Sequence, residues 1–263
     1  MNIDMFQQHK KQNKKISMVT CYDYNSATII AATDIHCILV GDSVAMVVHG
    51  FDSTIPADIP MMVLHTAAVA RGAKNKFIVA DMPFCSYRKG IALAVDAAEQ
   101  LIKAGAHAVK LEGAHGNLEI ISHLVHSGIP VMGHLGLTPQ SIHVMGGFKV
   151  QGKNKSQAEI LKKEAQQLQE AGCFSLVLEC IPAPIAKEIS HACAIPTIGI
   201  GAGPDTDGQV LVYQDLLGLN PNFTPKFLKR YLNGFEVIQS AIQNYHQEVT
   251  EQHFPRVPEH CFL

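Results

Sequence analysis

Short apolar runs that alternate with helix-like segments constrain the fold of this chain more than any other feature. Most of these runs are rich in β-branched residues, and they cover residues 16–23, 37–43, 77–83, 108–113, 130–136, 175–180, 196–203 and 209–215. Nearly continuous apolar runs of this length are typical of strands that are buried on both faces, as in a parallel sheet. The chain is therefore predicted to contain about eight buried strands.

The segments between these runs have the composition and spacing of helices. They are residues 60–73, 90–105, 116–128, 156–172 and 182–193. Several end at a glycine, which commonly follows the last turn of a helix. Ser156 and Glu159 predict a capping box at the start of the helix 156–172.

Repeated alternation of strand and helix predicts an α/β fold, specifically a (β/α)8 TIM barrel. We expect one domain over residues 1–263, with an N-terminal helical extension. The alternative is an open doubly wound sheet, but the glycine-rich stretch 199–204 ends in Pro204, where the dinucleotide-binding fingerprint requires Gly. The connection 137–155 is long enough to form a lid or a crossover.

Composition excludes several classes of partner. The formal net charge is −2, so no overall positive field attracts nucleic acid. We expect no membrane partner, because no apolar run reaches the roughly 18 residues that cross a bilayer. The polar, basic N-terminus lacks the apolar stretch of a signal peptide. Seven cysteines without C-x-x-C spacing indicate reduced thiols in a cytoplasmic protein.

Ionisable residues follow several of the predicted strands directly. Asp42, Asp81 and Glu112 end three consecutive runs, and His134 and Glu179 lie near the ends of two later runs. In a barrel, the carboxyl ends of the strands surround one face, where active sites are found. We therefore expect the three acids to converge.

Three neighbouring carboxylates repel one another, and a bound divalent cation removes this conflict. Oxygen ligands suit a hard cation, and three protein ligands leave room for water and substrate, which favours Mg²⁺ over Zn²⁺. For each acid taken alone, the alternative is a helix cap or an ion-pair partner.

Lys110 lies two residues before Glu112, so both side chains point to the same face of the strand. Lys110 either pairs with Glu112 or holds a substrate anion beside the metal. Mg²⁺ and a lysine together can chelate a 2-oxo acid and stabilise the enolate formed when a base removes the adjacent proton. Glu179 is the candidate base, since apolar neighbours disfavour its charged form, and the alternative is an acid satisfied within the core.

Ordered motifs cover nearly the whole chain. They include TCYDYNSA (20–27), VGDSVAMVVHG (40–50), ARGAKNKFIVADMPFCSY (70–87), AVKLEG (108–113), GIPVMGHLGLTPQS (128–141), LVLECIP (176–182) and IPTIGIGAGPDTDGQVLVYQDLLG (195–218). Through these motifs the chain resembles the ketopantoate hydroxymethyltransferase family. The resemblance implies a (β/α)8 barrel that assembles as a homodecamer. It also implies transfer of a hydroxymethyl group from 5,10-methylenetetrahydrofolate to 3-methyl-2-oxobutanoate, which gives 2-dehydropantoate for pantothenate and coenzyme A biosynthesis.

The resemblance also implies roles for residues within the matching motifs. It implies that Mg²⁺ is held by Asp42, Asp81 and Glu112. It implies Glu179 as the general base. The implied substrate contacts are Asp42, Ser43, Asp81, Lys110 and His134. The stretches 49–59 and 112–117 vary from the commoner family forms and leave the folate contacts open.

Two other classes of protein share parts of this pattern. One is a Mg²⁺-dependent enolate enzyme of the phosphoenolpyruvate mutase and isocitrate lyase group, whose cysteine-bearing KKCGH-type loop does not occur in this sequence. The other is a barrel without catalytic activity. Loss of a metal ligand or of the base would favour such a barrel, but all of these residues are present.

Overall fold

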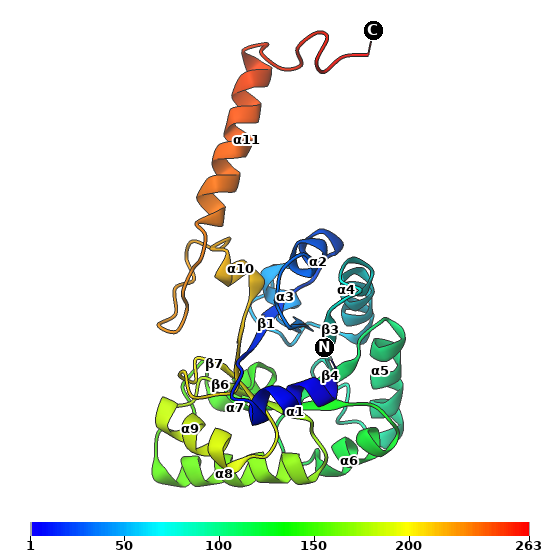
Figure 1. Ribbon diagram of the computed structural model, residues 1–263, viewed down its shortest axis with the longest axis vertical. Coiled ribbons are helices and arrows are strands. Elements are labelled where there is room, and N and C mark those ends of the chain that lie inside the picture. The colour runs from blue at the N-terminus through cyan, green and yellow to red at the C-terminus, as the bar shows by residue number, and fades with distance from the viewer. Residues whose placement is uncertain (1, 263) are drawn as a thin grey trace. The chain divides into compact units, whose positions relative to one another are not determined.

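The computed structural model describes residues 2–262, and the chain divides into two compact units. The first unit spans residues 1–212 and the second spans residues 213–263. The strands lie in the first unit, which we call the barrel unit (Figure 1). The expectation that residues 1–263 form one domain stays a prediction.

The barrel unit is a closed barrel of parallel strands in the order β1 to β8, with β1 paired to β8. The strands are β1 (Ile16–Thr20), β2 (Cys37–Val40), β3 (Phe77–Asp81), β4 (Ala108–Glu112), β5 (Val131–Gly136), β6 (Ser175–Glu179), β7 (Thr197–Ile200) and β8 (Gly208–Leu211). The predicted (β/α)8 TIM barrel is confirmed, and each predicted run contains one strand. Most strands end before their apolar runs do, because the chain turns into a loop within the last residues of each run.

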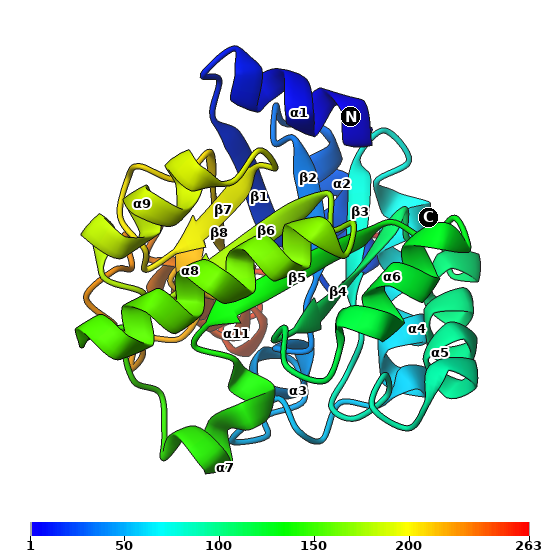
Figure 2. The ribbon, with the colours of Figure 1, turned by 90° about the horizontal axis from the view of Figure 1, so that it is seen from below.

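Helices lie around the strands (Figure 2). They are α2 (Tyr24–Ala31), α3 (Val44–Val47), α4 (Ile59–Gly72), α5 (Ile91–Lys103), α6 (Leu118–His126), α7 (Ile142–Met145), α8 (Lys155–Glu170) and α9 (Ala183–Ala192), together with the 3-10 turn η1 (Pro139–Ser141). The predicted helices correspond to α4, α5, α6, α8 and α9. The connection 137–155 contains η1 and α7.

The start of α8 differs from the prediction. The N-cap is Asn154, whose backbone is extended and whose side chain accepts a hydrogen bond from the Gln157 amide. Ser156 is already inside the helix, and the Glu159 carboxylate lies 2.9 Å from Lys162 Nζ. The predicted capping box is therefore wrong, because an asparagine two residues earlier supplies the stronger cap.

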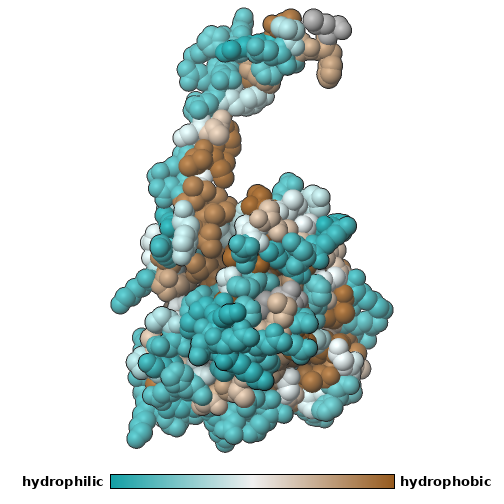
Figure 3. All heavy atoms as spheres, viewed as in Figure 1, coloured by the Kyte–Doolittle hydropathy of each residue, from teal (hydrophilic) through white to brown (hydrophobic). Residues whose placement is uncertain are grey.

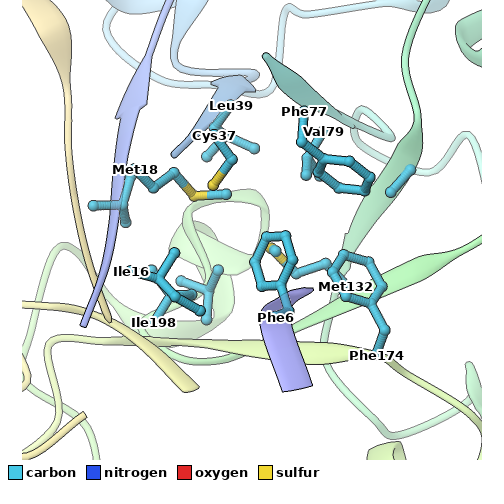
Figure 4. Packing of buried hydrophobic residues seen from close by; sticks show 13 residues of the cluster. Phe6, Ile16, Met18, Cys37, Leu39, Phe77, Val79, Met132, Phe174 and Ile198 are labelled. Atoms are coloured by element: carbon cyan, nitrogen blue, oxygen red, sulfur yellow. The ribbon is translucent and has the colours of Figure 1, made fainter. Parts of the chain in front are cut away.

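Helix α1 (Ile3–Lys11) closes the end of the barrel at which the strands begin. Phe6 is fully buried, and its ring meets the rings of Phe77 and Phe174 edge to face at centroid distances of 5.5 and 5.2 Å (Figure 4). Lys10 Nζ lies 2.7 Å from Asp207 Oδ2 and donates a hydrogen bond to the Ser190 carbonyl. Apolar residues at the strand starts thus fill this end of the barrel and leave the opposite end for polar side chains.

The second unit contains α10 (Tyr213–Leu216) and α11 (Gly234–Thr250). Apolar side chains gather along one side of α11 (Figure 3). The exposed apolar residues of this helix are Phe235, Val237, Ile238, Ile242, Tyr245 and Val249.

Two further observations concern the expected partners and thiols. Within residues 2–262, no helix has both the length and the apolar character needed to cross a membrane.

All seven cysteines are free thiols, as expected from their spacing.

Candidate active site

The acids predicted to converge lie at one end of the barrel, where the strands finish. Asp81 and Glu112 are the last residues of β3 and β4, and Asp42 lies just after β2. All three are almost completely buried, with exposed fractions of 4% for Asp42, 2% for Asp81 and 2% for Glu112. The barrel topology places them together because β2, β3 and β4 are neighbours.

Lys110 forms an ion pair with Asp81 across the β3–β4 register. The two residues are direct neighbours in the sheet, and Lys110 Nζ lies 2.9 Å from Asp81 Oδ1. Burial opposes the charge of Lys110, but Asp81, Glu112 and Asp42 outweigh burial and raise its pKa above the ordinary value. Among the described ion pairs, the partner of Lys110 is thus Asp81 and not Glu112.

Asp42 is linked to Asp81 through its backbone. The Asp42 amide donates to Asp81 Oδ2 over 3.0 Å. Burial of the Asp42 carboxyl, together with the charges of Asp81 and Glu112, raises the pKa of Asp42 well above its ordinary value. Asp81 and Glu112 therefore disfavour the ionisation of Asp42, as expected when carboxylates lie close together.

His134 connects two carboxylates on the strands either side of β5. Its Nδ1 lies 3.4 Å from Glu112 Oε1, and its Nε2 lies 3.2 Å from Glu179 Oε2. Burial and Lys110 oppose a charge on this ring, but Glu112 and Glu179 together raise the pKa of His134 to about 9. The chain of contacts Glu112–His134–Glu179 spans β4, β5 and β6.

Glu179 is more exposed than its apolar sequence neighbours suggested. Its side chain is 19% exposed, whereas that of His134 is 3% exposed. Of the residues in the chain Glu112–His134–Glu179, Glu179 is the one that solvent or a ligand reaches most directly.

Ser43 lies at the edge of this group. Its hydroxyl lies 2.8 Å from the Tyr22 hydroxyl, and either group can donate. Tyr22 is buried, so this contact joins the turn after β1 to the turn after β2. Contacts within the described structure join Asp42, Asp81, Lys110, Glu112, His134 and Glu179 into one group, whereas Ser43 is anchored through Tyr22.

Gln140 is a central residue that the sequence reasoning missed. Its side-chain Nε2 donates to Asp42 Oδ2 over 2.8 Å, and its backbone amide donates to Glu112 Oε2 over 3.0 Å. It lies in η1 and is 5% exposed. A neutral residue outside a strand end carries no charge signal, although Gln140 falls within the motif 128–141.

Each of the three acids has one oxygen held by an uncharged donor. Those oxygens are Asp42 Oδ2, Asp81 Oδ2 and Glu112 Oε2. The other oxygens of Asp81 and Glu112 are also buried: Asp81 Oδ1 lies 2.9 Å from Lys110 Nζ, and Glu112 Oε1 lies 3.4 Å from His134 Nδ1. Across residues 2–262, no group of three or more His, Cys, Asp or Glu side chains has the completed geometry of a metal site.

Comparison with known proteins identifies the family. The family model described as ketopantoate hydroxymethyltransferase matches residues 1–257. The chain belongs to the ketopantoate hydroxymethyltransferase family. A 3-methyl-2-oxobutanoate hydroxymethyltransferase of Coxiella burnetii is 58% identical over 263 residues, which cover 100% of this chain and 99% of the relative. One of Legionella pneumophila is 55% identical, with 100% of both chains covered.

Membership of the ketopantoate hydroxymethyltransferase family makes the chain an enzyme of the transferase class and sets aside the barrel without activity. A solved structure of 2,3-dimethylmalate lyase, a member of the PEP mutase/isocitrate lyase superfamily, matches with a TM-score of 0.60 at 12% identity. That match covers 99% of this chain and 91% of the lyase chain. At this identity the likeness shows a shared barrel fold alone.

Replacing Lys110 with Met should destabilise the folded barrel, because Asp81 would keep a buried carboxylate without its cationic partner. Breaking a buried pair in this way costs about 3–5 kcal/mol. Urea unfolding in the presence of EDTA measures the change. The control is Lys103→Met, which removes an exposed pair with Glu99 within α5 and should cost about 0–1 kcal/mol. Equal losses of stability in the two variants would contradict the prediction.

Proposed function

We propose that this enzyme transfers a hydroxymethyl group from 5,10-methylenetetrahydrofolate to 3-methyl-2-oxobutanoate and gives 2-dehydropantoate, a step of pantothenate and coenzyme A biosynthesis. In this reaction the oxo acid loses its C3 proton and the resulting enolate carbon bonds to the one-carbon unit. The two bonds from that unit to folate nitrogens break, a water molecule supplies the hydroxyl oxygen, and tetrahydrofolate leaves. The observation that carries the proposal is the grouping of Asp42, Asp81 and Glu112 beside the chain from Glu112 through His134 to Glu179. The relatives that are 54–58% identical are 3-methyl-2-oxobutanoate hydroxymethyltransferases, which supports the same substrate.

The oxo acid carries a carboxylate, and the site offers it a buried cation and a hydroxyl group. Lys110 is 4% exposed and keeps its charge, so its ammonium group can bind this carboxylate with little competition from water. Ser43 contributes a hydroxyl at the edge of the site. We assign substrate contacts to Asp42, Ser43, Asp81, Lys110 and His134.

The same acids fit Mg²⁺ in their donor chemistry. Each has one oxygen fixed by an uncharged protein donor, and the second oxygens of Asp81 and Glu112 are buried beside Lys110 Nζ and His134 Nδ1, at 2.9 and 3.4 Å. A divalent cation also favours the ionised form of Asp42, which its neighbours otherwise oppose. We propose Asp42, Asp81 and Glu112 as the ligands. When bound, Mg²⁺ would polarise the keto oxygen and make the adjacent carbon more acidic.

Glu179 is the proposed general base that removes the C3 proton of the oxo acid. Its carboxylate is partly exposed, and it is oriented by His134, whose other ring nitrogen faces Glu112. A general base needs this combination of access to the substrate and a fixed orientation.

We predict that Glu179→Gln slows enolate formation but leaves the binding of the oxo acid intact, because Gln keeps the shape and loses the basic oxygen. Removal of a general base typically slows the reaction about 100- to 10,000-fold. The measurement is deuterium incorporation at C3 of 3-methyl-2-oxobutanoate in D₂O with Mg²⁺ and without folate. Product formation on addition of methylenetetrahydrofolate tests the complete reaction.

The matched control is Glu170→Gln. Glu170 ends α8 and contacts only Gln166 through its side chain in the described structure, so this variant should exchange deuterium like the unaltered enzyme. Exchange at the normal rate in Glu179→Gln would assign the base to another residue. No exchange and no product in the unaltered enzyme would refute the proposed function.

A second prediction concerns the metal. Asp81→Asn should weaken Mg²⁺ binding, because it removes one of the negative charges that the cation requires. Isothermal titration of the folded protein with Mg²⁺ measures the affinity, and circular dichroism checks the fold. Asp96→Asn, on the outer helix α5, is the control and should titrate normally. If Asp81→Asn binds Mg²⁺ as tightly as the unaltered enzyme, these acids are not the ligands.

We also propose that the enzyme works in the cytoplasm as a homo-oligomer, with ten copies as the family resemblance implies. The seven free cysteines agree with a reducing compartment. Light scattering at micromolar concentration should give a mass of about ten chains of 28.6 kDa. A monomeric mass would contradict this prediction.

A further inference from the structure

The side chain of Gln140 uses every polar atom that it has. Nε2 donates to Asp42 Oδ2 over 2.8 Å and to the Met82 carbonyl over 3.0 Å, and Oε1 accepts a hydrogen bond from the Tyr87 hydroxyl over 2.8 Å. The two acceptors on one side and the hydroxyl donor on the other allow only one orientation of the amide. These three hydrogen bonds therefore hold the side-chain amide of Gln140 in a single position.

These contacts tie together the ends of three strands. Asp42 follows β2, Met82 follows β3 directly, and Glu112 ends β4 and accepts a hydrogen bond from the Gln140 backbone amide. Gln140 itself comes from the connection after β5. Gln140 thus donates hydrogen bonds directly to Asp42 and Glu112. It also donates one to Met82, the residue that follows Asp81.

Tyr87 contacts both Gln140 and Glu112 through its hydroxyl group. It is 1% exposed, and its hydroxyl accepts a hydrogen bond from the Glu112 amide over 3.3 Å while it donates to Gln140 Oε1. Gln140 and Tyr87 together therefore fix both the backbone and the carboxylate of Glu112. Neither side chain offers a charge of its own to a cation.

We propose that Gln140 is a positioning residue for the divalent cation, which fixes one oxygen of Asp42 and one of Glu112 so that their other oxygens are presented together. This inference rests on the metal site of the proposed function. Gln140 holds no ligand position and acts through the carboxylates. Partners that orient metal ligands typically change metal affinity 10- to 100-fold when they are removed.

The test is replacement of Gln140 with Met, which has nearly the same shape and cannot donate a hydrogen bond from its side chain. The probe is Mn²⁺, whose free form is counted by electron paramagnetic resonance as the protein is titrated. We expect the dissociation constant to rise about 10- to 100-fold. The turnover number at saturating metal should change much less than the metal concentration that gives half-maximal rate, because Gln140 does not contact reacting atoms.

Gln151→Met is the matched control. It is the same substitution on the same connection, and the Gln151 side chain donates only to the Lys149 carbonyl in the described structure. Its Mn²⁺ affinity should equal that of the unaltered enzyme. Thermal unfolding in EDTA identifies any variant that fails to fold. If Gln140→Met is such a variant, Gln140→Asn replaces it, because the shorter amide cannot span Asp42 and Tyr87.

Asp81→Asn separates the possible outcomes. If Asp81→Asn loses Mn²⁺ affinity while a folded Gln140 variant binds normally, the positioning role is refuted and the metal site stands. If Asp81→Asn also binds normally, the metal site fails and the role of Gln140 fails with it. A loss of affinity in both, with normal binding by Gln151→Met, supports the proposal.

Discussion

The buried charge of Lys110 is the feature on which the polar end of this barrel depends. An ammonium group without water requires anionic partners, and the β3–β4 register supplies Asp81 directly beside it. Asp81 in turn accepts the backbone amide of Asp42, so the turn after β2 is bound to the same pair. The Lys110 ammonium group and its partner Asp81 thus connect the ends of β2, β3 and β4. Lys110 neutralises one carboxylate, and the negative charge of the other acids is available to a bound ligand.

One end of the barrel contributes stability through apolar packing, and the other end carries the residues of the candidate active site. The end where the strands begin is filled by aromatic and aliphatic side chains, including Phe6 from α1 (Figure 4). The end where they finish holds a concentration of buried charges that is costly in any folded protein. A tightly packed apolar end offsets that cost and lets the loops at the other end follow the requirements of the site.

The sequence predicted the barrel because eight apolar runs alternate with helices, and it predicted the acids because charges interrupt those runs at their ends. It offered Glu112 as the ion-pair partner of Lys110, because the two residues share a strand, whereas the β3–β4 register places Asp81 beside Lys110. Gln140 escaped detection because its importance lies in hydrogen bonds between distant segments. Ser156 was misread as a cap because local propensity alone does not choose between two neighbouring polar residues.

Helix α1 has a consequence for how the chain is made. It is made before the strands, yet Lys10 pairs with Asp207, which lies 197 residues later in the chain. Helix α1 therefore cannot make its contact with Asp207 until almost the whole barrel unit has been synthesised. Contacts of such long sequence separation form late and slowly. The docking of this short polar helix, which buries Phe6, therefore marks the completion of the barrel.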